Sequence, residues 1–184
     1  MKLPVTRKSA LVIAATLAAL AIGGGWFIES GYYNIGADDH HTKWVLALIE
    51  RVRERSIAVR ARSLEVPATL EDPRGIAQGA QRYAALCAGC HLAPGAAKSD
   101  IRSGLYPHPP NLAQEDVQPA RRAFWIVKHG IKMSAMPAWS KTLDDASIWD
   151  VVAFIRKMPS MTPANYRELA RGAASLPEAA GNSP

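Results

Sequence analysis

The feature that most constrains this sequence is a C-x-x-C-H pentapeptide, Cys87-Ala88-Gly89-Cys90-His91, which contains the only two cysteines of the chain. Two thiols at this spacing can add to the two vinyl groups on one edge of a haem, and the adjacent histidine can then ligate the iron. The motif therefore predicts one covalent haem c, attached through Cys87 and Cys90, with His91 as an iron ligand. The alternatives are a redox dithiol, which usually sits in a βαβ context not evident here, and a zinc site, which needs two more soft ligands.

The N-terminus carries an uncharged apolar run from Ser9 to Ile28, preceded by Lys2, Arg7 and Lys8. A run of this length can cross a bilayer and is longer than the usual apolar region of a signal peptide. Positive flanking residues stay in the cytoplasm, so the rest of the chain is expected in the periplasm. Residues 1–30 are therefore predicted to be a single-pass anchor in a bacterial inner membrane, with a signal sequence as the alternative.

A second helical pattern runs from Thr42 to about Leu64, in which Trp44, Leu48 and Val52 recur every four residues opposite an arginine-rich face. We expect this apolar stripe to pack on the following domain. The alternative is a docking surface for a partner subunit or for anionic lipid. The formal net charge of +6 is interpreted in the same way, as attraction to acidic proteins or lipid headgroups rather than to nucleic acid.

Two further helical patterns frame the motif. From Gly75 onward, apolar residues at helical spacing predict a helix that runs directly into the C-x-x-C-H sequence. Gly79, on the buried side of this helix, indicates a close approach by another helix. The expected neighbour spans Asp144–Met158, with Thr142 and Asp145 as its capping pair.

The remaining segments are shorter. Ala93–Gln118 is rich in Gly, Pro and Ser and is predicted to be a loop around the cofactor, followed by a short helix over Ala120–His129. Another short helix should begin at Pro163, before a disordered tail. The expected organisation is an anchor (1–30), a loop with the arginine-rich helix and a linker (31–73), a haem domain (74–160), and a short helix with the tail (161–184).

These residues resemble a class I c-type cytochrome, of the small monohaem, membrane-anchored kind found in bacteria. In that family a glycine, an aromatic residue four positions later and the first cysteine four further on mark the N-terminal helix; Gly79, Tyr83 and Cys87 match. The resemblance covers about residues 74–160. It implies an all-α class I cytochrome c fold, to which the transmembrane and amphipathic helices are N-terminal additions.

The resemblance also implies how the haem is held. Pro110-Asn111-Leu112 matches a segment whose proline carbonyl accepts the Nδ1–H of the proximal histidine, so Pro110 should orient His91. Met136, followed by Pro137, matches the methionine ligand of the family, and a His/Met pair raises the reduction potential. Trp139 is expected either to donate its indole N–H to a haem propionate or to be buried in the core.

Other residues compete for these roles. Met133 is a rival iron ligand whose simplest interpretation is core packing, and His129 is a weaker rival at the end of its helix. Three more side chains are candidates for the propionate edge of the haem: Arg102, Tyr106 and His108. His40 and His41 are adjacent on an irregular segment and are not expected to share a metal ion.

Together these features predict an electron carrier rather than an enzyme, with a dehydrogenase or quinol-oxidising complex as donor and a terminal oxidase or reductase as acceptor. Five basic residues before and around Met136 are candidates for docking an acidic partner: Arg121, Arg122, Lys128, Lys132 and Lys141. One alternative is a haem-bearing subunit of a larger membrane oxidoreductase. Another is a peroxidase or gas-binding haem protein, which requires that Met136 does not ligate the iron.

Overall fold

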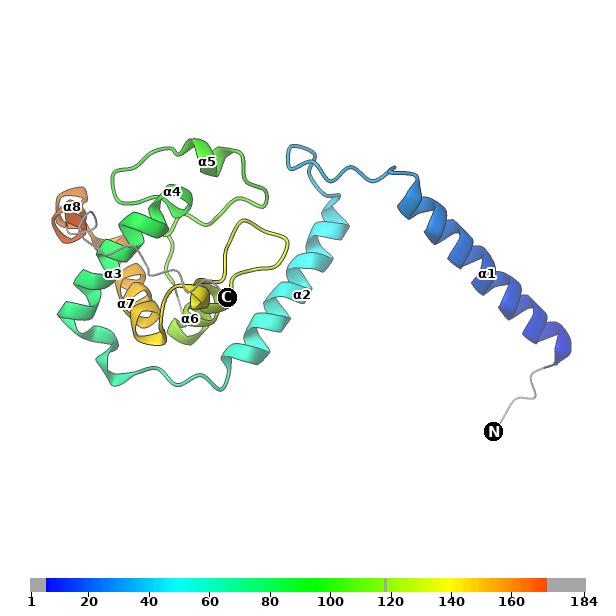
Figure 1. Cartoon of the computed structure of the whole chain (residues 1–184), viewed down its shortest axis with the longest axis horizontal. Helices are drawn as coiled ribbons and strands as arrows, with labels where there is room; N and C mark the ends of the chain where they lie inside the picture. The colour runs from blue at the N-terminus through cyan, green and yellow to red at the C-terminus, as the bar shows by residue number, and fades with distance from the viewer. Residues whose placement is uncertain (1–5, 118, 172–184) are drawn as a thin grey trace. The chain divides into compact units, whose positions relative to one another are not determined.

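A computed structural model describes residues 6–117 and 119–171 (Figure 1). These residues form helices joined by loops and contain no strand, which confirms the all-α fold. The chain divides into two units, Met1–Asp39 and His40–Pro184. The α-helices are α1 (Arg7–Glu29), α2 (Lys43–Ala61), α3 (Pro73–Leu86), α4 (Ala88–His91), α5 (Asp100–Ser103), α6 (Ala120–His129), α7 (Asp145–Lys157) and α8 (Pro163–Ala170). Three short 3₁₀ helices are η1 (Ala68–Glu71), η2 (Trp139–Lys141) and η3 (Met158–Ser160).

The first unit consists of α1 and the residues that follow it. Thr6 caps the helix, because its side-chain oxygen accepts a hydrogen bond from Ser9 N at 3.2 Å. The helix has 23 residues and a mean hydropathy of 2.1 over its most apolar window, and none of it is buried within the protein. At 1.5 Å per residue it is about 35 Å long, enough to span the hydrocarbon core of a bilayer. By length and composition the helix can therefore cross a membrane, as either a single-pass anchor or a signal sequence would.

The second unit is built around the crossing of α3 and α7. A Cβ placed on Gly79 would lie 2.0 Å from Asp150 O and 3.0 Å from the Cβ of Phe154, so only glycine allows this approach. One turn further along α3, the rings of Tyr83 and Phe154 pack with centroids 5.3 Å apart, and both side chains are fully buried. Arg82 also donates to Asp150 at 3.0 Å across the crossing.

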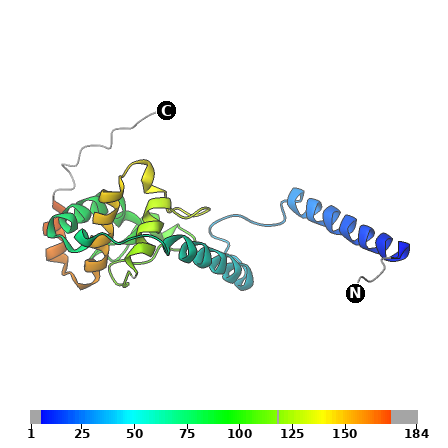
Figure 2. The ribbon, with the colours of Figure 1, turned by 90° about the horizontal axis from the view of Figure 1, so that it is seen from below.

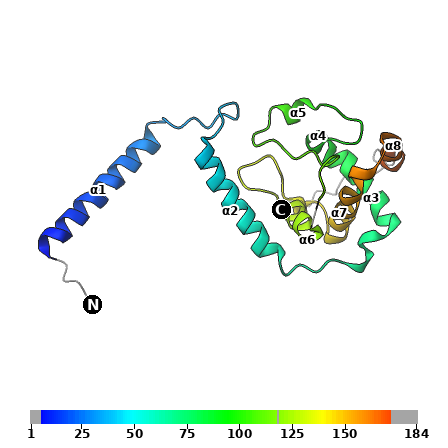
Figure 3. The ribbon, with the colours of Figure 1, turned by 180° about the vertical axis from the view of Figure 1, so that it is seen from behind.

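The other helices pack around this pair. α6 lies against α7, where Phe124 and Trp149 stack with ring centroids 4.1 Å apart. α8 lies against α3, and Tyr166 of α8 reaches Phe154, with ring centroids 6.2 Å apart. α2 lies on the far side of α6, so α2 and α8 are on opposite sides of the unit in Figures 1 and 3. The C-terminal residues 172–184, predicted to form a tail, lie outside the described residues.

The orientation of α2 differs from the prediction. Trp44, Leu48 and Val52 are 71%, 58% and 61% exposed, whereas Ile57 and Ala61 are buried. The expectation that the apolar stripe packs on the domain is therefore wrong, and another side of the helix does so.

The packed side of α2 offers an ion pair as well as apolar side chains. Glu54 lies on the packed side of α2 and accepts a hydrogen bond from Arg122 of α6 at 2.6 Å. Burial alone would raise the pKa of Glu54, but hydrogen bonds and charges of Arg122 and Arg53 outweigh it and hold the pKa below its usual value. Ile57 and Ala61 are buried on the same side of α2. This side therefore packs on the domain because it combines apolar burial with the Arg122–Glu54 pair.

Two local predictions also need correction. The cap of α7 is Asp144, whose Oδ1 accepts from Ser147 N at 2.8 Å. The predicted Thr142–Asp145 pair is wrong because Thr142 belongs to the preceding turn, where its backbone N–H donates to Trp139 O at 3.0 Å. The segment predicted as loop after the motif contains the short helix α5, which Ser99 caps. The predicted helix Ala120–His129 has the bounds of α6.

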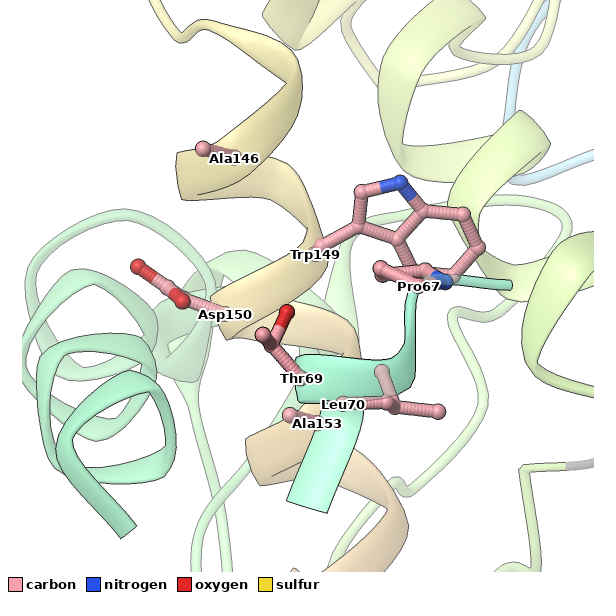
Figure 4. A pocket seen from close by; sticks show the side chains of 7 residues that line it. All are labelled: Pro67, Thr69, Leu70, Ala146, Trp149, Asp150 and Ala153. Carbon is pink, nitrogen blue, oxygen red and sulfur yellow. The ribbon is translucent and has the colours of Figure 1, made fainter. Parts of the chain in front are cut away.

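A hollow lies between η1 and α7, where the indole of Trp149 lies beside Pro67 (Figure 4). Seven residues line it: Pro67, Thr69, Leu70, Ala146, Trp149, Asp150 and Ala153. None of them is a predicted haem-binding residue. The hollow lies where η1 packs on α7, and no residue of the C-x-x-C-H motif lines it.

The crossing at position 79 generates a prediction for stability. Gly79→Ala should lower the free energy of unfolding by about 1–3 kcal/mol, because the added methyl meets backbone atoms that cannot move aside. This loss should appear despite the better helix propensity of alanine, which by itself favours the variant by about 1 kcal/mol. Urea unfolding of the haem-loaded protein measures the difference.

Gly104→Ala is the matched control, because a Cβ at position 104 meets nothing closer than Ile101 O at 3.9 Å. Equal stability of Gly79→Ala and Gly104→Ala would contradict the packing described for α3 and α7.

Candidate haem site

The C-x-x-C-H motif sits where α3 passes into α4. Helical hydrogen bonding continues through it, from Cys87 N to Tyr83 O and from His91 N to Cys87 O, both at 2.9 Å. Cys87 and Cys90 are three positions apart on this helical path, so their side chains lie on one side of it. Both thiols are partly buried and unpaired. The local fold thus presents two sulfurs and one imidazole from a single turn.

The surroundings of Cys87 do not favour a reactive thiolate. Burial, with a smaller effect from Cys90, raises the pKa of Cys87 to about 12. A reactive C-x-x-C needs the opposite shift, toward a stable thiolate at neutral pH. In the described part of the chain, no three side chains of the Cys, His, Asp or Glu type gather closely enough to hold a metal ion. Neither the redox nor the zinc alternative finds support in this geometry.

The imidazole of His91 is held in one orientation. Its Nδ1 lies 3.0 Å from Pro110 O, and a carbonyl can only accept, so Nδ1 carries the proton and Nε2 keeps its lone pair. Leu112 N also donates to His91 O at 3.2 Å, which fixes the same segment to the backbone of the motif. Burial lowers the pKa of His91, although the hydrogen bond to Pro110 opposes this shift. The side chain is therefore a neutral imidazole at pH 7, the form that binds metals.

The chain leaves the motif through a strained residue. Leu92 has a φ of 63°, in the left-handed region that is rare for a leucine. The hydroxyl of Tyr83 donates to Leu92 O and holds this turn in place. The aromatic residue of the N-terminal helix therefore has two roles, since its ring fills the α3–α7 core and its hydroxyl anchors the backbone beyond His91.

The loop after the motif folds back onto it. Ser99 Oγ donates to Gly89 O, and Arg102 donates to Pro109 O at 3.0 Å, next to the carbonyl that orients His91. The ring of Tyr106 stacks on His40 with centroids 4.3 Å apart. His108 Nδ1 lies 3.3 Å from Arg102 O. The segment thus places two of the propionate candidates, Arg102 and Tyr106, in a fixed and partly buried setting.

Two polar atoms in this segment are buried without a partner. They are Arg102 Nε and the hydroxyl oxygen of Tyr106. Burying a hydrogen-bonding atom without a partner is costly, so each of these atoms needs an acceptor from a water molecule, an ion or a ligand. A haem carries two anionic propionates, which supply acceptors of the kind that both atoms lack. Together with the imidazole and the two thiols, these atoms fit a haem.

Met136 is positioned by a tightly closed loop after α6. Ile131 N donates to Met136 O at 3.1 Å, and Met136 N donates to Ser134 Oγ at 3.2 Å. Gly130 has a φ of 64°, and a Cβ at this position would lie 2.6 Å from both Met136 O and the carbonyl carbon of Pro137. Only glycine therefore permits the loop to return so close to its starting point.

The remaining candidates lie in different surroundings. Met136 and Trp139 pack against the same core as Cys87 and Leu112. Met133 is fully exposed, so the interpretation of Met133 as a core residue is wrong. The reason is local, since Met133 sits at the loop tip with a φ of 58°. His129 ends α6, and its ring lies 4.9 Å from that of Trp125.

The helical fold and the C-x-x-C-H motif are consistent with a class I c-type cytochrome domain inside the second unit. Residues 74–155 match the family model described as cytochrome C oxidase, cbb3-type, subunit III. No solved structure matches the chain. The resemblance to class I c-type cytochromes is thereby confirmed for the part of the chain that carries the motif.

Within this domain, Cys87 and Cys90 are the residues that would bind the haem covalently, and His91 would ligate its iron. Sequence reasoning missed the roles of Ser99, Gly130 and Ser134, which position the loops through contacts with the backbone. A glycine directly after a helix is a recognised stop signal, so Gly130 was detectable. The role of Ser99 depends on a contact between distant backbone segments and left no signal in the sequence.

The contact between Tyr83 and Leu92 generates a second prediction. Tyr83→Phe should lower the free energy of unfolding by about 1–3 kcal/mol, because Leu92 O would remain buried without its donor. The haem content per chain should not change, because the hydroxyl does not touch the motif cysteines. Chemical unfolding together with the haem absorbance per protein measures both quantities.

Tyr166→Phe removes the same atom from a partly buried tyrosine for which no side-chain hydrogen bond is described. If Tyr166→Phe and Tyr83→Phe destabilise the protein equally, the anchoring role of the Tyr83 hydroxyl is wrong.

Proposed function

We propose that this chain is an electron-transfer cytochrome c, anchored in a bacterial inner membrane by α1 with its haem domain in the periplasm. One haem c, bound through Cys87 and Cys90 and ligated by His91 and Met136, relays single electrons. The donor is a dehydrogenase or quinol-oxidising complex, and the acceptor is a terminal oxidase or reductase. The observation that carries the proposal is the hydrogen bond from His91 to Pro110, which leaves one imidazole nitrogen available on the C-x-x-C-H turn.

When bound, the haem supplies reversible one-electron chemistry between ferrous and ferric iron. The residues of the chain hold and tune this group and perform no bond-breaking step of their own. Pro110 fixes the tautomer of His91. Met136 offers a soft, neutral thioether that favours ferrous iron. Arg102 and Tyr106 offer the propionates two donors, and Trp139 is the third candidate donor.

Three exposed cations in the segments before and around the Met136 loop support docking of an acidic redox partner. Arg121, Lys132 and Lys141 are exposed. The other two basic candidates are engaged within the protein. Arg122 pairs with Glu54, and Lys128 pairs with Asp145 at 2.7 Å. The proposed docking charge therefore comes from the three exposed residues, which steer a partner through long-range attraction.

A second candidate function is that of a haem-bearing subunit in a larger membrane oxidoreductase. It is favoured by the description of the matched family, which names an oxidase subunit. Purification of the full chain from its native membranes in mild detergent separates the two functions. A stable stoichiometric complex supports the subunit, and a protein recovered alone supports the free-standing, membrane-anchored relay.

The ligation generates a third prediction. Met136→Ala should abolish the methionine-to-iron charge-transfer band of the ferric protein and lower the reduction potential, because the thioether that favours ferrous iron is removed. Met133→Ala should leave both unchanged, because the Met133 side chain lies in solvent. Optical spectroscopy and a potentiometric titration measure the two effects.

If Met133→Ala loses the band and Met136→Ala keeps it, Met133 is the iron ligand and the assignment of Met136 is wrong. A wild-type ferric protein without this band would contradict His/Met ligation altogether and favour a peroxidase or gas-binding haem site.

A further inference from the structure

The outward side of α2 is apolar and uncovered. Trp44, Leu48 and Val52 follow one another at intervals of four residues and are more than half exposed, and Val59 continues the line with 52% exposure. Residues spaced in this way lie along one face of a helix. On a water-soluble surface, a row of this length with a tryptophan at its start is a feature that calls for a covering surface.

The charges of α2 are sorted between its two sides. Arg51 and Arg55 are exposed and, by helical spacing, lie beside the apolar row. Neither arginine forms an ion pair within the described part of the chain. The carboxylates of the helix lie on the packed side, where Arg53 approaches Glu50 at 3.8 Å and Glu54 at 3.2 Å. The outward face therefore combines an apolar row with arginines, and the carboxylates of the helix lie on the other side.

The segment between α1 and α2 limits how far α2 can lie from the end of α1. Only residues 30–42 separate the end of α1 from the start of α2. Even fully extended, this tether spans about 45 Å. If α1 crosses a membrane, α2 is held close to the surface of that membrane at a high effective concentration. This argument rests on the anchoring proposed above.

We propose that the outward face of α2 binds the surface of the membrane in which α1 is anchored. Trp44, Leu48 and Val52 insert at the boundary between headgroups and acyl chains, and Arg51 and Arg55 pair with the phosphates of anionic phospholipids. Amphipathic helices with arginine and tryptophan bind bilayer interfaces in this way. A protein partner is the less favoured occupant, because the short tether of residues 30–42 holds α2 near the membrane surface at all times, whereas a protein has to be recruited to it.

Photocrosslinking from the helix tests the proposal in the full-length, haem-loaded protein. In that protein both native cysteines are consumed by the haem, so the Leu48→Cys variant carries one reactive thiol for a benzophenone label. The protein is reconstituted into nanodiscs of phosphatidylcholine with or without phosphatidylglycerol, illuminated, and analysed by mass spectrometry. The proposal predicts phospholipid adducts from position 48, with more of them when phosphatidylglycerol is present.

Two further label sites make the result interpretable. Glu168→Cys places the label on exposed α8, on the opposite side of the unit from α2 (Figure 2), and should give few lipid adducts. Ala18→Cys places it within α1 and should give lipid adducts whether or not α2 binds the surface. Adducts from position 18 but not from position 48 overturn the membrane role of α2 alone. Absence of adducts from both positions overturns the proposed anchoring as well.

Charge reversal tests the cationic border of the face. Arg55→Glu should reduce lipid adducts from position 48 by about tenfold in nanodiscs that contain phosphatidylglycerol, because an attractive charge becomes a repulsive one. Arg60→Glu makes the same change five residues along, on another side of α2, and should have little effect. Equal losses in both variants overturn the assignment of the face. The crosslinking from position 48 is also repeated in native membranes. Adducts with a protein in place of adducts with lipid would overturn the choice of a lipid surface.

Discussion

The hydrogen bond between His91 and the carbonyl of Pro110 is the interaction on which the site depends. It joins the turn that carries both cysteines to a segment about twenty residues away, and it decides which imidazole nitrogen remains available. Because the acceptor is a backbone carbonyl, the tautomer does not depend on the protonation of a neighbouring side chain. Burial keeps the same imidazole neutral at pH 7. The fold itself thus fixes the tautomer of His91 and favours its neutral form.

The rest of the second unit holds the two ends of this interaction in place. The close crossing at Gly79 fixes α3 against α7, and α3 carries the motif at its C-terminal end. Tyr83 then joins the core to the backbone after His91, at Leu92. On the other side, Gly130 closes the loop that presents Met136. Gly79, Gly130 and Tyr83 therefore fix the two segments that flank the predicted haem, namely the chain after His91 and the loop that carries Met136.

Much of this could be predicted from the sequence, because the signals are local. The C-x-x-C-H spacing, the helix over Ala120–His129 and the close approach at Gly79 are each read from a few consecutive residues, and the structure contains the helix and the crossing. The roles assigned to Met136 and Trp139 stay predictions. The orientation of α2 could not be derived from its own periodicity, since it depends on Arg122 in a distant helix. Similarly, nothing in the sequence shows that Arg102 and Tyr106 are buried with unpartnered atoms.

The most direct test of the central claim is the intact mass of the chain after expression in a bacterium that matures c-type cytochromes, followed by treatment with a thiol-alkylating reagent. The account predicts a mass increased by one haem and no alkylation, since both sulfurs are bound in thioethers. A chain without added haem whose Cys87 and Cys90 are both alkylated would contradict it.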